Sequence, residues 1–339
     1  LHGGQERLPQ HPHHLRRTGA HDMDYGRSDA KAYAREHMKG IWAAALMPFT
    51  GDLRIDEDGF RENVRHWTED LGIEGLFVTG KQGEFFSMSV DERKRSFELA
   101  VEATRGRGHT IMSCSDQNMD VVIDLARHAA DVGADYIVVH APALHFHSAR
   151  DETLLGYYRA IAKQVDIGIA LWSHPDSGYL MSPELCNRLA DIETVVAIKY
   201  SVPRPLYSEL TALASDRIQV STASEEEWLD NILELDWRLY LCSSPPFLLQ
   251  TATDRRMHDY TWAAFEGRVD DARSISASLD PVRAALKGTR PAEKPHAHQK
   301  YWQELLGQVG GRVRGPLLEL TEDEKRITRE AFEQCGLGS

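Results

Sequence analysis

The sequence has few cysteines, no long apolar run and no excess of positive charge. Its four cysteines, Cys114, Cys186, Cys242 and Cys335, are far apart and form no CxxC or metal-type cluster, so we expect reduced thiols. No stretch approaches the roughly 20 apolar residues that cross a bilayer, and the first residues do not form a signal-peptide core. The formal net charge of -13 opposes phosphate backbones and anionic membrane surfaces. We therefore expect a cytoplasmic protein whose partners include neither nucleic acid nor membrane.

Residues 1–38 also lack apolar periodicity. They are rich in His, Arg, Gly and Pro, as in the run from His11 to Arg17. Such a composition is typical of a solvated tail, because it offers too little apolar surface to form a core. The sequence therefore predicts a flexible N-terminal arm over residues 1–38.

From residue 39 onward, short apolar runs alternate with amphipathic stretches. The runs are typical of buried strands, and the stretches have helical periodicity. Eight runs predict an α/β fold, a (β/α)8 TIM barrel over residues 39–256, since an open Rossmann sheet needs fewer strands. The later pattern is entirely helical and predicts a C-terminal helical extension over residues 257–339. The expected strands are 41–47, 75–79, 110–114, 136–140, 167–172, 195–199, 218–221 and 239–242, and expected helices include 56–68, 90–104, 119–132, 152–165, 183–190, 225–233, 262–279, 281–286, 297–306 and 322–335.

Polar residues follow most of the expected strands. In TIM barrels the active site lies at the C-terminal ends of the strands, so these residues are expected to converge. They are Gly80 to Glu84 after the second strand, Ser113 and Ser115 after the third, His140 and His145 after the fourth, Trp172 to Pro175 after the fifth, Lys199 and Tyr200 at the sixth, and Ser243 and Ser244 after the eighth.

Lys199 is the first candidate for chemistry, because it ends the apolar run Val195 to Ile198. An amine at the mouth of an apolar pocket loses solvation, its pKa falls, and its neutral form can attack a carbonyl. This position suggests a Schiff-base nucleophile. A surface charge at the end of a strand is the alternative for a lysine considered alone.

The loop after the second expected strand is the second candidate. Gly80 and Gly83 flank Lys81 and Gln82, and they permit a turn whose backbone N–H groups form a nest for an anion such as a 2-oxo acid carboxylate. An ordinary strand-to-helix turn is the alternative. Glu84 is expected either to orient the loop amides or to cap the next helix.

Together these motifs resemble the dihydrodipicolinate synthase and N-acetylneuraminate lyase superfamily of class I aldolases, from about residue 40 onward. The segment Ile41 to Thr50 is similar to the first strand and its Thr-Pro turn, and Gly80 to Glu84 resembles the GxxGE loop. Ala197-Ile198-Lys199 resembles the strand with the Schiff-base lysine, and Gly310 to Leu317 resembles the closing segment. The resemblance implies Lys199 as nucleophile, no metal or organic cofactor, and a homo-oligomer, either a tetramer or a dimer.

The chain departs from the family pattern at several site positions. Lys81 and Gln82 stand where Thr or Ser is common, and Trp172 stands where a tyrosine serves as the general acid/base. Ser177 falls near an arginine that binds the second substrate in dihydrodipicolinate synthases, and Pro142 to His145 replaces a double-tyrosine turn. These differences argue against a role in lysine biosynthesis and mark the chain as a divergent member.

Histidine is the natural replacement for the missing tyrosine, since its pKa of about 6.5 suits proton transfer at neutral pH. His174 is the first candidate and His145 the second, although each is also interpretable as a solvated loop residue. Trp172 is expected to line a substrate channel or to pack at the barrel mouth. Ser243 and Ser244 either bind substrate or satisfy the last strand end.

The sequence therefore predicts a lyase that forms an imine between Lys199 and a pyruvate-type 2-oxo acid and catalyses aldol or retro-aldol chemistry. A dehydratase that uses the same imine is the close alternative, because Gly83 to Ser87 resembles the loop of 5-dehydro-4-deoxyglucarate dehydratases. Lys199-Tyr200 and Cys242-Ser243-Ser244 resemble aromatic hydratase-aldolases such as trans-o-hydroxybenzylidenepyruvate hydratase-aldolase. A noncatalytic barrel that binds a 2-oxo acid is the third hypothesis.

Overall fold

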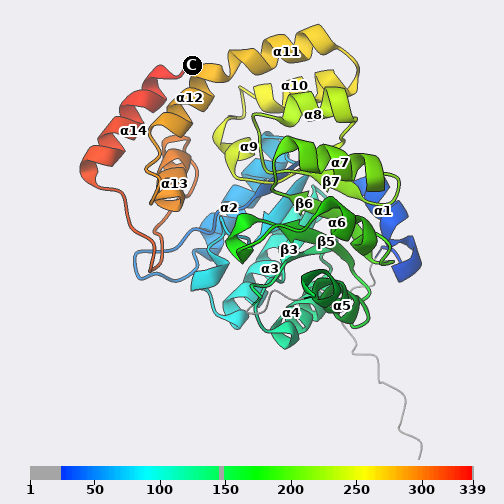
Figure 1. The fold of residues 1–339 in the computed structure, drawn as a ribbon. Coiled ribbons are helices and arrows are strands. Elements are labelled where there is room, and N and C mark those ends of the chain that lie inside the picture. The colour runs from blue at the N-terminus through cyan, green and yellow to red at the C-terminus, as the bar shows by residue number, and fades with distance from the viewer. Residues whose placement is uncertain (1–23, 145–148, 338–339) are drawn as a thin grey trace, which may run out of the picture.

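A barrel of eight parallel strands is the centre of the computed structural model, which describes residues 24–144 and 149–337 (Figure 1). The strands pair in the order β7-β6-β5-β4-β3-β2-β1-β8. Most strand residues are buried, as expected for a parallel sheet that is covered by helices. The predicted (β/α)8 TIM barrel is confirmed. The strands are β1 (Gly40–Ala44), β2 (Gly75–Val78), β3 (His109–Ser113), β4 (Tyr136–His140), β5 (Gly168–Ser173), β6 (Val195–Tyr200), β7 (Gln219–Ser221) and β8 (Leu239–Leu241).

The seam between β7 and β8 is joined by a side chain. The Ser221 hydroxyl donates to the carbonyl oxygen of Leu239 at 2.7 Å and accepts from the backbone N–H of Leu241 at 2.8 Å. One hydroxyl thus satisfies a buried backbone donor and a buried backbone acceptor. Ser221 thereby brings the two end strands of the sheet together.

Alternate residues along most of the strands enter two separate apolar clusters. Ile41 and Ala43 of β1 belong to the large cluster that includes the surrounding helices. Trp42 contacts Tyr136 of β4 with ring centroids 5.8 Å apart, and strands that are not neighbours in the sheet meet only across the barrel interior. Period-2 alternation therefore separates the interior of the barrel from the layer beneath the helices.

Helices follow the strands and form a ring around the barrel (Figure 1). Ser89 begins α3 with a capping box, in which its hydroxyl accepts from the Glu92 N–H while the Glu92 carboxylate accepts from the Ser89 N–H. The ring consists of α2 (Glu57–Arg65), which continues into a π-helical turn (His66–Asp70), α3 (Val90–Thr104), α4 (Met119–Val132), α5 (Arg150–Ala162), α6 (Pro183–Leu189), α7 (Arg204–Ala214) and α8 (Trp228–Leu235).

The segment before β1 is folded against the barrel in its described part. A short 3-10 turn (Arg27–Asp29) leads into α1 (Ala30–His37), which buries Ala30 and Ala34. The Tyr25 hydroxyl accepts from the Gly168 N–H at the start of β5, at 2.8 Å, which places the segment at the N-terminal end of the barrel. Residues 24–38 therefore differ from the flexible arm expected for residues 1–38, because a stripe of small apolar side chains outweighs the polar composition. Residues 1–23 lie outside the described part.

The predicted C-terminal helical extension is also present. It comprises α10 (Arg256–Phe265), α11 (Val269–Ser278), α12 (Asp280–Gly288), α13 (Pro295–Leu305) and α14 (Glu322–Gln334), and the short α9 (Pro245–Leu248) precedes it within the range expected for the barrel. α10 contacts both α8 and α11, and α13 packs against α14 and α9. Among the described residues, no helix is long and apolar enough to span a membrane.

Candidate active site

Lys199 is enclosed at the C-terminal end of β6, with only 2% of its surface exposed. Its Nζ lies 4.8 Å from the ring centroids of both Phe77 and Trp172, so two aromatic faces border the amine. Within residues 24–144 and 149–337, no hydrogen bond or ion pair reaches this Nζ. Such an enclosure removes water without supplying a negative charge.

The charge balance around Lys199 favours the neutral amine. Its pKa is lowered from 10.5 to about 8, chiefly by burial; Cys242 opposes this shift, and nearby Lys81 contributes to it. The Cys242 thiol stays protonated at neutral pH, because burial raises its pKa to about 12. A lysine with a pKa near 8 has a reactive neutral fraction at physiological pH, as a Schiff-base nucleophile requires.

Rings from β4 and β5 continue the site beside Lys199. His140 is paired in register with Trp172, and Trp172 with Lys199, so the three side chains come from adjacent strands. The rings of His140 and Trp172 are 4.7 Å apart in a T-shaped contact. Burial lowers the pKa of His140 to about 4, which leaves its ring neutral at physiological pH. The Trp172 indole N–H is buried and has no hydrogen-bond partner among the described residues.

His174 lies in the loop after β5, and its ring centroid is 6.1 Å from that of Trp172. Its Nδ1 accepts from the Asp176 N–H at 3.1 Å and lies 3.2 Å from Asp176 Oδ2. Asp176 Oδ2 also accepts from Lys81 Nζ at 2.6 Å, so the loops after β2 and β5 are joined by an ion pair. Burial lowers the pKa of His174; Asp176 opposes this shift, whereas Lys81 and Lys199 reinforce it.

The glycine loop after β2 has the tight geometry that its sequence suggests. Gly80 sits so close to the Phe77 ring that an added Cβ would lie 2.6 Å from it, and a Cβ at Gly83 would lie 3.1 Å from the backbone of Thr79. Thr79 itself adopts a left-handed φ of 50°. The Thr79 hydroxyl and the side-chain amide oxygen of Gln82 (Oε1) are buried without a hydrogen-bond partner in the described chain. Unpaired polar atoms of this kind are costly unless a ligand or water meets them.

Glu84 anchors this loop to the C-terminal extension. Its side chain is fully buried, and its Oε1 lies 2.6 Å from Nζ of Lys300, which is 1% exposed. Lys300 also donates to the Arg312 carbonyl at 2.6 Å. Glu84 Oε2 accepts from the Arg314 backbone N–H at 2.9 Å. The Glu84 carboxylate therefore joins the glycine loop to the C-terminal extension. It does not cap α3, because the N-cap of that helix is Ser89.

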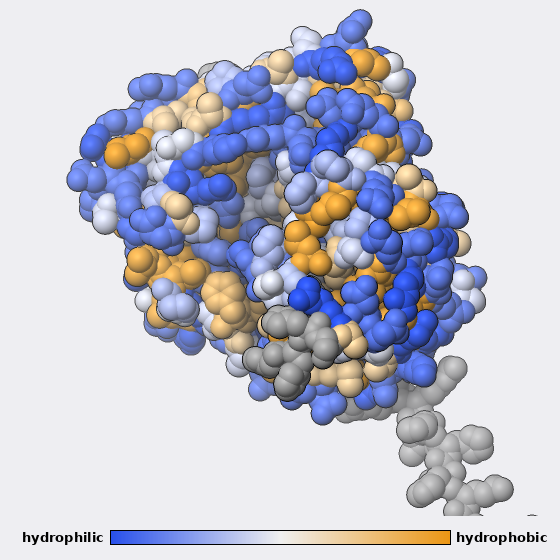
Figure 2. All heavy atoms as spheres, in the orientation of Figure 1, coloured by the Kyte–Doolittle hydropathy of each residue, from blue (hydrophilic) through white to orange (hydrophobic). Residues whose placement is uncertain are grey.

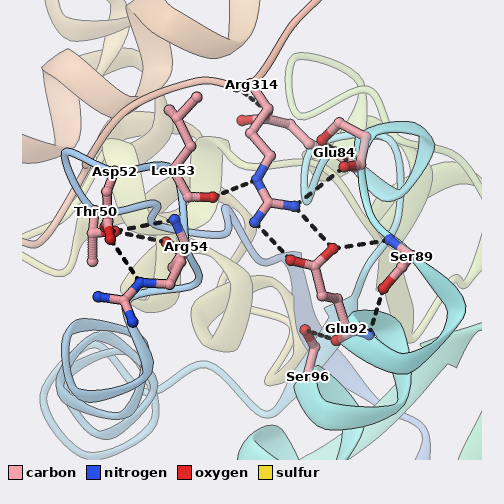
Figure 3. Close-up of polar contacts among 10 residues, drawn as sticks. Thr50, Asp52, Leu53, Arg54, Glu84, Ser89, Glu92, Ser96 and Arg314 are labelled. Atoms are coloured by element: carbon pink, nitrogen blue, oxygen red, sulfur yellow. Dashed lines mark hydrogen bonds and ion pairs between the residues drawn. The ribbon is translucent and has the colours of Figure 1, made fainter.

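The Arg314 side chain lies on the outer side of the Glu84 junction, by which we mean the contacts of Glu84 with Lys300 and Arg314 (Figure 3). Its guanidinium donates to both carboxylate oxygens of Glu92, at 2.7 and 3.0 Å, and to the carbonyls of Leu53 and Ser87. It also stacks over the Phe49 ring at 4.1 Å. A bidentate pair with two further acceptors fixes the closing segment against the start of α3.

His296 of α13 provides another contact to the glycine loop. Its Nε2 lies 2.9 Å from the Lys81 carbonyl oxygen, and its ring meets Phe86 edge to face. Because Nε2 can bond this acceptor only as a donor, the proton is assigned to Nε2. Figure 2 shows the surface hollowed between the C-terminal helices and the barrel.

A family model supplies the decisive comparison. The model described as the dihydrodipicolinate synthetase family matches residues 37–335. This chain belongs to that family. Named relatives include dihydrodipicolinate-type synthases and N-acetylneuraminate lyases, so the dihydrodipicolinate synthetase family places the chain among aldolase-type lyases.

Individual members of the dihydrodipicolinate synthetase family align over different lengths. A 4-hydroxy-tetrahydrodipicolinate synthase of Methanothrix thermoacetophila is 26% identical over 297 residues, covering 87% of this chain and 96% of the relative. An N-acetylneuraminate lyase of Clostridium perfringens is 33% identical over 165 residues, covering 48% of this chain and 57% of the relative. The crystal structure of dihydrodipicolinate synthase from Aquifex aeolicus has a TM-score of 0.78 at 23% identity and covers 88% and 98% of the two chains, which supports the fold.

Within this family fold, the predicted site residues occupy different environments. Lys199, Trp172 and His174 lie together, and Gly80 to Gly83 form the neighbouring loop. The Ser243 hydroxyl contacts the Tyr240 hydroxyl at 2.6 Å, and the Ser244 hydroxyl donates to the Ala44 carbonyl at 3.2 Å. Both serines are thus engaged at the end of β8. His145 lies outside the described residues.

Sequence reasoning missed the long-range partners of the glycine loop in this family fold. These partners are Asp176, His296, Lys300 and Arg314, and the aromatic neighbour Phe77 was missed as well. Asp176 had a local signal, because it lies two residues after His174. Lys300 had no local sequence signal, since its carboxylate partner Glu84 is more than two hundred residues away in the sequence.

Proposed function

We propose that this member of the family is a lyase that forms an imine between Lys199 and a pyruvate-type 2-oxo acid and catalyses aldol or retro-aldol chemistry. The observation that carries the proposal is the Lys199 amine, which is enclosed by two aromatic rings, has no anionic partner in the described chain and has a pKa lowered to about 8. A structural lysine at this depth would need a carboxylate partner.

Substrate binding is assigned to the loop after β2. The backbone amides of residues 80–83 would hold the carboxylate, and the Lys81 ammonium would add positive charge. Lys81 is paired with Asp176, so a substrate carboxylate would compete for the same ammonium. The free indole N–H of Trp172 is placed to donate to a substrate oxygen, although an indole cannot replace a tyrosine in proton transfer.

In the retro-aldol direction, the Lys199 amine attacks the C2 carbonyl and water leaves, which gives a protonated imine. A base removes the proton of the C4 hydroxyl, the C3–C4 bond breaks, and its electron pair moves into C2–C3 while the imine nitrogen becomes neutral. An aldehyde leaves, the enamine takes a proton at C3, and water releases the 2-oxo acid. His174 is the proposed proton carrier, because burial lowers its pKa and so favours the neutral ring that can accept a proton.

Borohydride reduction with pyruvate tests the imine. We expect a stable adduct on the wild-type protein by intact mass, its loss in Lys199→Ala, and its retention in the surface control Lys94→Ala. Product analysis then separates the reactions: pyruvate plus an aldehyde supports the aldolase, whereas an intact carbon skeleton that has lost water supports the dehydratase. No adduct with pyruvate or with a panel of 2-oxo acids would contradict the proposal and favour a noncatalytic binding barrel.

A further inference from the structure

Asp176 places one carboxylate oxygen between two groups of the candidate site. Its Oδ2 lies 2.6 Å from Lys81 Nζ and 3.2 Å from His174 Nδ1. The three side chains come from two loops, after β2 and after β5, and all are partly exposed. His174 also caps the 3-10 turn Pro175–Ser177, because its Nδ1 accepts from the Asp176 N–H, and this cap holds the imidazole beside the Asp176 carboxylate.

Two hydrogen-bonding arrangements compete at Nδ1 of His174. In one, Nδ1 carries no proton and accepts from the Asp176 N–H at 3.1 Å, which leaves the proton on Nε2. In the other, Nδ1 carries a proton and donates to Asp176 Oδ2, which leaves Nε2 free to act as a base. Whether Nδ1 engages the backbone N–H or the Oδ2 of Asp176 therefore decides which ring nitrogen can accept a substrate proton.

We propose that Asp176 is a positioning residue that sets the tautomer and orientation of His174, and that Lys81 couples this control to binding of the substrate carboxylate. The proposal rests on the function proposed above. When a substrate carboxylate engages Lys81, the ammonium is drawn from Asp176 Oδ2. The released oxygen then accepts more strongly from Nδ1, which favours the form of His174 with a basic Nε2.

Asp176 and Lys81 have opposite effects on the protonation of His174, as the groups that face its ring show. These groups are Asp176, Lys81, Lys199 and His140, whose ring centroid is 6.4 Å away. The carboxylate of Asp176 favours the protonated imidazole, and the ammonium of Lys81 disfavours it. Removing the Asp176 carboxylate should therefore move the acidic limb of the pH–rate profile to lower pH. Removing the Lys81 ammonium should move it to higher pH.

Exchange of the pyruvate methyl protons in D₂O reports this step without an aldehyde partner. After Lys199 has formed the protonated imine with loss of water, His174 Nε2 removes a proton from C3. The C–H electron pair becomes the C2–C3 double bond, and the imine π electrons move to nitrogen. Delivery of a deuteron to C3 and hydrolysis return labelled pyruvate, so protons and electrons balance.

The experiment measures this exchange by NMR at saturating pyruvate from pH 5 to pH 9, together with borohydride adduct formation. We expect Asp176→Asn to keep the adduct, to slow exchange by at least about tenfold and to move the acidic limb to lower pH. Lys81→Met should move the limb to higher pH and raise KM. Asp176→Glu should restore part of the rate.

The control is Asp124→Asn, which removes the acid from another half-exposed Lys–Asp pair, 2.7 Å from Lys94. The exchange rate of this variant and the acidic limb of its pH–rate profile should match those of the wild type. An exchange rate within twofold of the wild type in Asp176→Asn, with an unmoved limb and an intact adduct, would overturn the role of Asp176 and leave the imine proposal standing. A wild-type protein that forms no adduct would instead overturn the proposed function, and this inference with it.

Discussion

Two lysines are almost completely buried in this barrel, and their surroundings differ in one respect. Lys300, which is 1% exposed, lies 2.6 Å from the Glu84 carboxylate and donates to a backbone carbonyl. Lys199, which is 2% exposed, faces two aromatic rings and has no hydrogen bond or ion pair in the described chain. Burial lowers the pKa of both amines, but only at Lys300 does a carboxylate oppose it.

The difference separates a structural lysine from a candidate nucleophile. A buried ammonium that is paired with a carboxylate holds two segments together and stays charged. A buried amine without such a partner is destabilising when charged and reactive when neutral. The absence of an anionic partner, rather than burial, therefore identifies Lys199 as the candidate nucleophile.

The largest expected effect is on the free energy of unfolding, which two matched lysine substitutions should change in different directions. Lys300→Met should lower the free energy of unfolding by about 3–5 kcal/mol, because it leaves the Glu84 carboxylate buried without a partner. Lys199→Met should leave it unchanged or raise it by about 1–3 kcal/mol at pH 7, because it removes a buried charge. Urea denaturation measures both values.

The surface variant Lys94→Met serves as the control for these substitutions, and we expect a change within about 0.5 kcal/mol. Equal losses of stability in Lys300→Met and Lys199→Met would show that the two lysines have the same structural role.

The pH dependence of stability sharpens the same comparison. The pKa of Lys199 is lowered from 10.5 to about 8 in the folded protein, so between these values the unfolded chain binds more protons. The stability of the wild type should therefore rise with pH across this window, relative to Lys199→Met, by a total of about 3 kcal/mol. Urea titrations from pH 7 to pH 10 measure the difference, and parallel curves for the two proteins would contradict it.

A smaller effect is expected at the outer side of the Glu84 junction. Arg314→Met should lower the free energy of unfolding by about 2 kcal/mol. The substitution removes a mostly buried guanidinium, its bidentate pair with Glu92 and its two further hydrogen bonds. Its neighbour Arg312 is a matched control, since its pair with Glu319 is exposed and should contribute less than about 1 kcal/mol. Similar melting temperatures for Arg314→Met and Arg312→Met would show that the junction adds little.

The barrel was predictable because its signals are local. Apolar runs mark buried strands wherever they occur, and the expected strand 136–140 coincides with β4. Strand boundaries were wrong where an apolar run continues past the sheet: the expected strand was 41–47, whereas β1 spans Gly40–Ala44. The segment before β1 was misjudged because a stripe as short as Ala30 and Ala34 gives only a weak periodic signal in the sequence, although burial of these residues is enough to dock α1 on the barrel.

The candidate site was predictable only in part, for a related reason. Lys199 and the glycine loop have local patterns, and topology brings the ends of their strands together. The pair Glu84–Lys300 and the contact of His296 with the Lys81 carbonyl depend on how the C-terminal extension packs on the barrel. No periodicity near Lys300 encodes that packing, so its partner could be read only from the three-dimensional structure.

The most direct test locates the reactive lysine by peptide mapping. Wild-type protein would be incubated with pyruvate at pH 8, reduced with borohydride, digested and sequenced by mass spectrometry. We expect the modification on Lys199, with Lys300 and Lys81 unmodified, since only Lys199 combines burial with the absence of an anionic partner. Modification of Lys81 or Lys300 in place of Lys199 would contradict the distinction between the two buried lysines.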